Sequence, residues 1–198
     1  MKNVYALICG SNYQNSWLTD TSRNDALKFS QYMSNLGVPV NQVMVLLDNQ
    51  YTRKNVMKEL RSIARHMPSG STAVLYFAKP DVYCDDNIHN YKIITDDELS
   101  YEFMLASDNY KNDPDWKIRV IIIADTYYSP SPSIWQFEDT PVEIVTIKTS
   151  SYGSQRLFKL LEESNANQLT IREIATKLDT IEVSHDYLWD QTLFNVNL

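Results

Sequence analysis

Residues 120–131 read VIIIADTYYSPS, and this stretch predicts the fold. Val120 to Ile123 form an unbroken β-branched run, too short for a helix and apolar at every position, as in a strand buried between two layers. The run stops at Asp125, which a threonine, two tyrosines and a Ser-Pro turn follow. Ligands of open α/β sheets bind at the carboxyl ends of the strands. The acid and the tyrosines are therefore expected where a site would lie.

Strand and helix signals alternate along the rest of the chain. Short apolar runs bounded by turn residues predict strands at 4–9, 42–48, 72–78, 118–124 and 142–147, with 191–198 as a candidate last strand. Helical spacing and capping signals predict helices at 25–36, 52–67, 95–105, 154–163 and 170–181. This order predicts one α/β domain over residues 1–198, a three-layer sandwich around a mostly parallel sheet of five to six strands.

The composition limits the classes of partner. The 198 residues suffice for one domain with a sizeable core, and 25 acidic against 18 basic residues give a net charge of −7. The charges are spread along the chain rather than in blocks, so neither nucleic acid nor an anionic membrane is an expected partner. The N-terminal apolar run is too short for a signal peptide or a membrane span, and the chain is expected in the cytoplasm.

Common cofactor and catalytic motifs are missing from the sequence. There is no GxGxxG or GxxxxGK[ST] loop, no HExxH helix and no GxSxG elbow, and the chain has only four glycines. Its two cysteines, Cys9 and Cys84, lack metal-ligand spacing, and Cys9 is expected to be a buried core residue. Neither a cofactor nor a bound metal is expected.

A set of short motifs, each weak alone, carries a family resemblance through its order. The motifs are ALICGSNY (6–13), Asn24-Asp25-Ala26, LLD (46–48), TRKNVMKEL (52–60), PSGS (68–71), TDDEL (95–99) and QTLF (191–194). Together they resemble the caspase-like peptidase domain (peptidase C14), and its metacaspase branch more than the animal caspases. Leu193 replaces the proline of the family's last motif. The resemblance implies a flavodoxin-like topology for the sheet.

The two catalytic positions of that family are substituted in this chain. The family's third strand ends in FxFSGHG, which carries the histidine base, and its fourth ends in DxCHSG, which carries the cysteine nucleophile. Here the third strand ends YFAKPD (76–81) and the fourth ends ADTYYS (124–129), which puts Pro80 at the histidine and Tyr127 at the cysteine. Proline does not titrate, and a tyrosine with a pKa of about 10 is protonated at neutral pH. The resemblance therefore implies an inactive member, a pseudoprotease.

A pseudoprotease acts by binding, so the expected partner is a protein, such as an active caspase-like protease or its substrate. The resemblance places Asp25 and Asp125 in the pocket that takes an Arg or Lys side chain in metacaspases. Paired carboxylates would hold such a cation by charge-assisted hydrogen bonds. Alternatively, Asp25 only favours the N-terminus of its helix and Asp125 only ends a strand.

Four further residues are candidates for the cleft or a protein contact, namely Lys79, Tyr128, Trp135 and Phe137. Trp135 and Phe137 replace the substrate loop of the family. Large aromatic side chains beside a cleft either anchor a partner or fold back and fill the groove.

Two other classes of function stay open. Cys84 and His89 follow the third predicted strand and would carry a relocated cysteine hydrolase, which needs a thiolate with a base in hydrogen-bond reach. A small ligand would instead bind in the crevice at the strand ends, which the scarcity of glycine disfavours. The sequence sets no oligomeric state.

Overall fold

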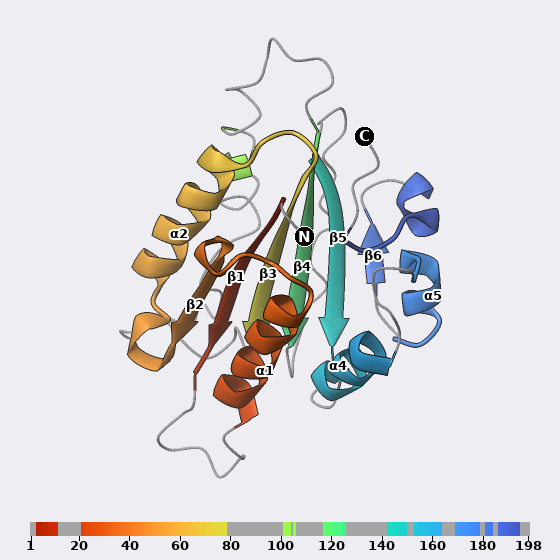
Figure 1. Ribbon diagram of the computed structural model, residues 1–198, viewed down its shortest axis with the longest axis horizontal. Coiled ribbons are helices and arrows are strands. Elements are labelled where there is room, and N and C mark those ends of the chain that lie inside the picture. The colour runs from red at the N-terminus through yellow and green to blue at the C-terminus, as the bar shows by residue number, and fades with distance from the viewer. Residues whose placement is uncertain are drawn as a thin grey trace.

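The protein is a three-layer α/β/α sandwich, in which helices cover both faces of a six-stranded sheet (Figure 1). The computed structural model describes residues 3–11, 21–78, 101–103, 105, 117–125, 142–149, 153–163, 169–178, 181–183 and 186–194. Every strand in these ranges belongs to the one sheet. The predicted fold class is confirmed.

The sheet is parallel except at one edge. Its strands are β1 (Val4–Gly10), β2 (Val43–Leu47), β3 (Ser71–Ala78), β4 (Ile118–Asp125), β5 (Val142–Thr149) and β6 (Ile181–Val183). They pair in the order β2-β1-β3-β4-β5-β6, and only β6 runs antiparallel to its neighbour. The chain moves from β1 outward to β2 and returns to β3 on the other side of β1. That reversal between β1 and β3 is the switch point of a flavodoxin-like sheet.

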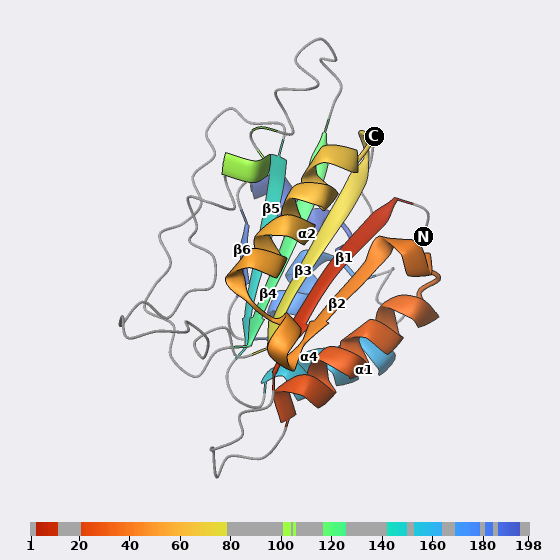
Figure 2. The ribbon, with the colours of Figure 1, turned by 90° about the vertical axis from the view of Figure 1, so that its left-hand side faces the viewer.

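The helices divide between the two faces of the sheet. They are α1 (Thr21–Asn35), α2 (Arg53–His66), α4 (Gly153–Glu163) and α5 (Ile171–Ala175), and short 3-10 turns lie at Val40–Gln42, Asp48–Gln50 and Asp186–Asp190. α2 lies on one face, and α1 and α4 lie on the other, as the two perpendicular views show (Figures 1 and 2). Residues 101–103 and 105 are helical and lie on the α2 face.

β4 contributes side chains to both cores, as its unbroken apolar run predicts. Successive residues of a strand point to opposite faces. Ile121 and Ile123 accordingly pack into the core beneath α1 and α4, whereas Val120 and Ile122 pack into the core beneath α2. All four side chains are buried. A strand in this central position has no face left for polar residues, so only its ends are free to carry them.

Local signals account for the limits of α1 and α2. α1 begins at Thr21, four residues before its predicted start, and ends before Gly37, whose φ of 78° is a left-handed conformation that glycine adopts without strain. In α2, the Thr52 hydroxyl accepts a hydrogen bond from the Asn55 backbone N–H (3.3 Å). At the other end, His66 Nδ1 lies 2.7 Å from the Ser62 carbonyl oxygen, so this histidine contacts the last turn as its position predicts.

The predictions for the last third of the chain need two corrections. The predicted helix 170–181 has its capping box, formed by Thr170 and Glu173, but α5 ends at Ala175 and Ile181 begins the edge strand β6. Of the predicted strand 191–198, the described residues 191–194 contain only an isolated bridge between Thr192 and Thr170. Leu193 and Phe194 are 0% and 3% exposed and both pack into the core beneath α1 and α4, so these neighbours do not alternate between two faces as residues of a strand do.

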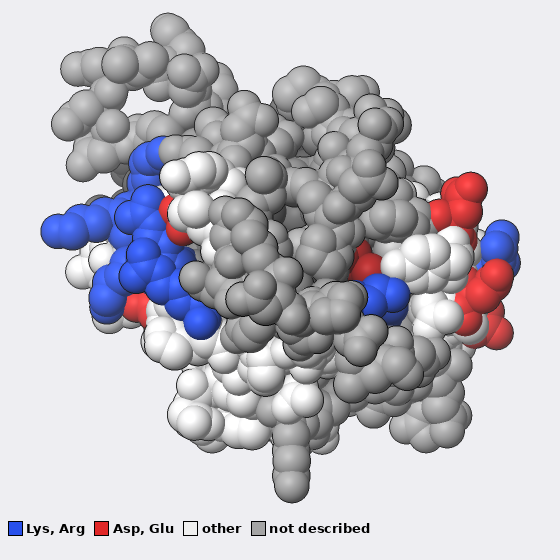
Figure 3. All heavy atoms as spheres, turned by 90° about the horizontal axis from the view of Figure 1, so that it is seen from above, with Lys and Arg blue, Asp and Glu red and all other residues white. Residues whose placement is uncertain are grey.

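The surface charge is uneven. Seen from above the view of Figure 1, Lys and Arg side chains gather on the side where α2 lies (Figure 3). Residues 53–65 hold five basic residues and one acidic residue, although the chain as a whole carries a net charge of −7. The basic residues are therefore not spread evenly along the chain, contrary to the expectation from the sequence, because five of the 18 lie in this one helix.

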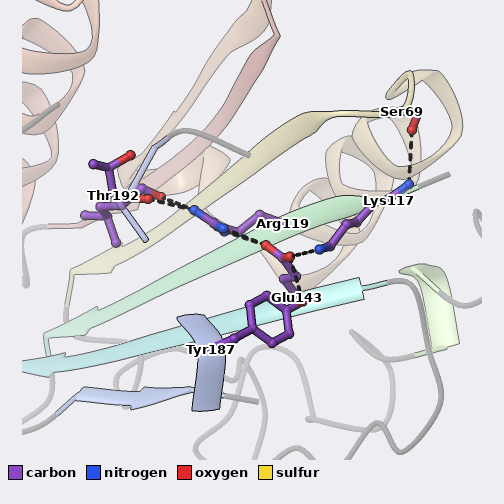
Figure 4. A network of polar contacts seen from close by, with 7 residues as sticks. Ser69, Lys117, Arg119, Glu143, Tyr187 and Thr192 are labelled. Carbon is purple, nitrogen blue, oxygen red and sulfur yellow. Dashed lines mark hydrogen bonds and ion pairs between the residues drawn. The ribbon is translucent and has the colours of Figure 1, made fainter. Parts of the chain in front are cut away.

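A buried ion pair ties the amino ends of β4 and β5 together (Figure 4). Arg119 and Glu143 are register partners with side chains 1% and 2% exposed, and Arg119 Nε and Nη2 donate to Glu143 Oε2 at 2.9 and 2.6 Å. Glu143 Oε1 accepts from Lys117 Nζ (2.5 Å) and the Tyr187 hydroxyl (2.7 Å). Arg119 Nη1 donates to the Thr192 carbonyl oxygen (2.7 Å), which fixes the C-terminal segment to the sheet.

The electrostatics of this pair predict an acid-sensitive stability. Burial raises the pKa of the Glu143 carboxyl, but the hydrogen bonds from Lys117 and Tyr187 and the charge of Arg119 outweigh burial and hold this pKa below its ordinary range. Because the folded pKa is depressed, the stabilisation is fully present above the unfolded pKa of about 4.3 and is lost as the pH falls through the folded value.

We expect Glu143→Gln to lower the free energy of unfolding by about 3–5 kcal/mol at pH 7, since it leaves the buried Arg119 guanidinium without its carboxylate. Urea unfolding at several pH values should also show that the Glu143→Gln variant loses less stability below about pH 5 than the wild type does. Glu162→Gln, on the exposed surface of α4, is the matched control. Parallel acid profiles for the wild type and Glu143→Gln would contradict the assignment.

Candidate functional site

The carboxyl ends of the parallel strands meet at one edge of the sheet, opposite the Arg119–Glu143 pair. β1 ends at Gly10, β3 at Ala78, β4 at Asp125 and β5 at Thr149. The register pairs Ala78 with Asp125 and Asp125 with Thr149. The chain therefore leaves these neighbouring strands at the same level, before Lys79 and before Thr126. The next few residues include Pro80 and Tyr127, the positions that the family resemblance aligns with the catalytic histidine and cysteine.

The first turn of α1 packs directly on the end of β1. A Cβ atom added to Gly10 would lie 2.6 Å from the Ala26 Cβ and 2.6 Å from the Ser22 carbonyl oxygen. Only glycine leaves room for backbone this close. The helix therefore sits at the switch point between β1 and β3, where sheets of this topology bind their ligands.

Asp25 is buried beside this contact. It is 5% exposed and precedes Ala26, which touches the end of β1. Ser22, Asp25, Ala26 and Phe29 are all buried and share the helical stripe that faces the sheet. The assignment of Asp25 to a pocket for a basic side chain stays a prediction, as does its alternative role at the helix N-terminus.

Asp125 ends β4 as predicted, and its backbone lies at the same edge as Asp25. One strand, β3, lies between β1 and β4. At about 4.8 Å per strand, the ends of β1 and β4 are about 10 Å apart. The structure describes the Asp125 backbone and not its side chain.

A second ion pair flanks the edge and has no signal in the sequence. Arg23 Nε donates to Asp48 Oδ2 at 3.0 Å, with both side chains about 40% exposed. Asp48 directly follows β2 and has a φ of 49°, a left-handed conformation that aspartate tolerates better than most residues. The pair joins the end of β2 to the first turn of α1 and bounds the edge on the β2 side.

Cys9 is a core residue, as predicted. Its side chain is 0% exposed and packs beneath α2, and burial raises the pKa of its thiol above the ordinary value. A nucleophile needs the thiolate, so this cysteine is chemically inert. Among the described residues it is the one cysteine, and the one described histidine, His66, contacts the last turn of α2.

The remaining predicted site residues lie outside the described part of the chain. They are Lys79, Pro80, Cys84, His89, Tyr127, Tyr128, Trp135 and Phe137. Within the described part, no three His, Cys, Asp or Glu side chains come close enough to hold a metal ion. No helix there combines the length and the apolar character needed to cross a bilayer.

Comparisons with known proteins support the fold. No protein-family model and no curated protein matches the chain. Among solved structures it is similar to protein GSU0716 from Geobacter sulfurreducens, with a TM-score of 0.68 over 98% of this chain and 99% of that chain. The two sequences are 12% identical. At that identity the likeness shows a shared fold alone.

The contact between α1 and β1 yields a prediction on stability. Gly10→Ala should lower the free energy of unfolding by about 1–3 kcal/mol, because the new methyl group meets both the Ala26 side chain and the Ser22 backbone. Urea unfolding followed by circular dichroism measures the change. Ser11→Ala, at the next and half-buried position, should change it by less than about 0.5 kcal/mol. Equal effects of the two substitutions would refute the close approach.

Proposed function

We propose that this protein is a catalytically inactive caspase-like domain, a pseudoprotease that regulates a partner protein by binding it at the carboxyl edge of the sheet. The observation that carries the proposal is the register of Ala78 with Asp125. It agrees with the motif order, in which the third and fourth strands deliver the two catalytic groups side by side. In this sequence neither strand end is followed by a cysteine or histidine within five residues.

Inactivity follows from the side chains available at these strand ends. Acyl transfer by a thiol needs a cysteine of lowered pKa and a base in hydrogen-bond reach. Pro80 supplies no base, and the phenol of Tyr127 is protonated at neutral pH. Cys9, the nearest described thiol along β1, is buried on the α2 face and has a raised pKa.

Binding of a basic side chain is the activity that the described acids support. Asp25 is a buried acid at the switch point, and the backbone of Asp125 stands two strands away at the same edge. Buried acids at such a crevice are candidates for ligand recognition. The proposed partner is a protein that presents an Arg or Lys side chain, such as an active caspase-like protease or its substrate. A cytoplasmic location is proposed with it, in keeping with the free thiol of Cys9.

The purified protein is expected not to hydrolyse fluorogenic peptides that end in Arg or Lys. Iodoacetamide should alkylate Cys84 at the rate of an ordinary thiol with a pKa of about 8.5, since the proposal gives this thiol no activating base. Peptide cleavage that disappears in Cys84→Ser or His89→Ala would overturn the proposal and establish a relocated cysteine hydrolase.

Millimolar peptides with a C-terminal Arg should raise the midpoint of thermal unfolding, whereas the citrulline analogue, which has the same shape and no charge, should not. At a peptide concentration of 100 times the Kd, the stabilisation is about 2.7 kcal/mol. Asp25→Asn and Asp125→Asn should each abolish the shift. Asp186→Asn, an exposed acid near the C-terminus, should leave it intact. No shift in the wild type, or an equal shift with citrulline, would argue against an acidic pocket.

A further inference from the structure

The exposed face of α2 carries a continuous row of cations. Lys54, Lys58, Arg61 and Arg65 stand at positions i, i+4, i+7 and i+11, which an α-helix aligns within about 60° of one another. All four side chains are exposed, while the opposite face of the helix is buried in the core. The row, called the α2 stripe below, extends over about 16 Å at 1.5 Å per residue.

Stability does not explain the α2 stripe. Like charges four residues apart, as in Lys54 and Lys58 or Arg61 and Arg65, destabilise a helix. The first turn holds Arg53 and Lys54 and no acidic residue, although the helix dipole disfavours cations at that end. Arg61 pairs with Glu102, and Arg65 lies in the last turn, where the dipole favours a cation. Lys54 has neither advantage, and a ligand of opposite charge would relieve its repulsion with Lys58.

Two exposed apolar side chains, Tyr101 and Leu105, lie beside the α2 stripe. Their segment is held there by Glu102, which is 5% exposed and whose Oε1 accepts a hydrogen bond from Arg61 Nε at 2.6 Å. This contact and the burial of Phe103 fix the helical residues 101–103 and 105 against α2. On the same turn, Tyr101 and Leu105 are 59% and 40% exposed and stand four residues apart, so they share one outward face.

We propose that the α2 stripe, together with Tyr101 and Leu105, binds an acidic segment of a partner protein whose apolar side chains contact the tyrosine and the leucine. Exposed carboxylates would pair with Lys54 and with the guanidinium of Arg65, which suits bidentate contacts. Lys58 and Arg61, which also contact Glu59 and Glu102, would add to the positive potential of the stripe. This surface lies on the α2 face, whereas the carboxyl edge is bounded by α1, so it does not depend on the pseudoprotease proposal.

The charge balance favours an acidic peptide over a nucleic acid. Glu102 and Glu59 already pair with Arg61 and Lys58. The remaining positive charge of the α2 stripe is enough to bind a few carboxylates of a peptide. Affinity for a nucleic acid, in contrast, grows with the number of phosphates that basic residues neutralise. The net charge of −7 also repels a long polyanion at low salt.

The test uses the full chain and a labelled 16-residue peptide with Leu and Phe at helical spacing and Glu at the other positions. Fluorescence anisotropy should show saturable binding that weakens at least tenfold in Lys54→Glu/Arg65→Glu and severalfold in Tyr101→Ala. Lys28→Glu, an exposed cation on α1, is the matched control and should bind as the wild type does. A peptide with Gln in place of every Glu should not bind.

The thermal unfolding midpoint separates a binding role from a structural one. Lys54→Glu should keep or raise the midpoint, because an acid suits the helix N-terminus. A lowered midpoint would mean that the stripe serves stability and would overturn the proposal. Equal peptide affinity in the wild type and the double variant would overturn it too. So would tighter binding, through the same residues, of an oligothymidine of 20 nucleotides or of phosphatidylserine vesicles.

Discussion

The buried ion pair between Arg119 and Glu143 connects the central strands β4 and β5 to the C-terminal segment. Two unlike charges are buried next to each other at the amino ends of β4 and β5, and each needs further partners to offset the loss of water. Those partners come from Lys117, Tyr187 and the Thr192 carbonyl. The network thus joins three parts of the chain, namely the start of β4, the start of β5 and residues 186–194. This polar network lies at the amino edge of the sheet, opposite the strand ends that carry the candidate site.

The central elements could be predicted because their signals are local. The run Val120–Ile123 marks a strand buried on both faces, and the structure places it in the middle of the sheet. The ends of α2 follow from Thr52 and from the Pro and Gly after Met67. Prediction failed at the last third of the chain. The helical spacing of Ile174, Leu178 and Ile181 suggested one long helix, but the free edge of β5 recruits Ile181 into β6, and a single sequence gives no signal of that edge.

The candidate site was predictable only in part. The strand-end rule and the family resemblance led to Asp25 and Asp125, and the first of these is buried at the switch point. The pair Arg23–Asp48 joins residues 25 positions apart, and no local pattern predicts such a contact. The α2 stripe has a signal in the sequence, since five of the 18 basic residues lie among residues 53–65. The periodicity of the helix then places four of them on one face.

The Arg119 contacts also decide what detachment of the C-terminal segment would do. Arg119 and Glu143 are 24 residues apart and meet when β4 pairs with β5, but the acceptor at Thr192 lies 73 residues beyond Arg119. The ion pair therefore needs only the sheet, whereas the Thr192 contact also needs residues 186–194 in place. If this segment detached, Arg119 would lose the Thr192 acceptor, Glu143 would lose the Tyr187 hydroxyl, and water would reach the amino edge of the sheet.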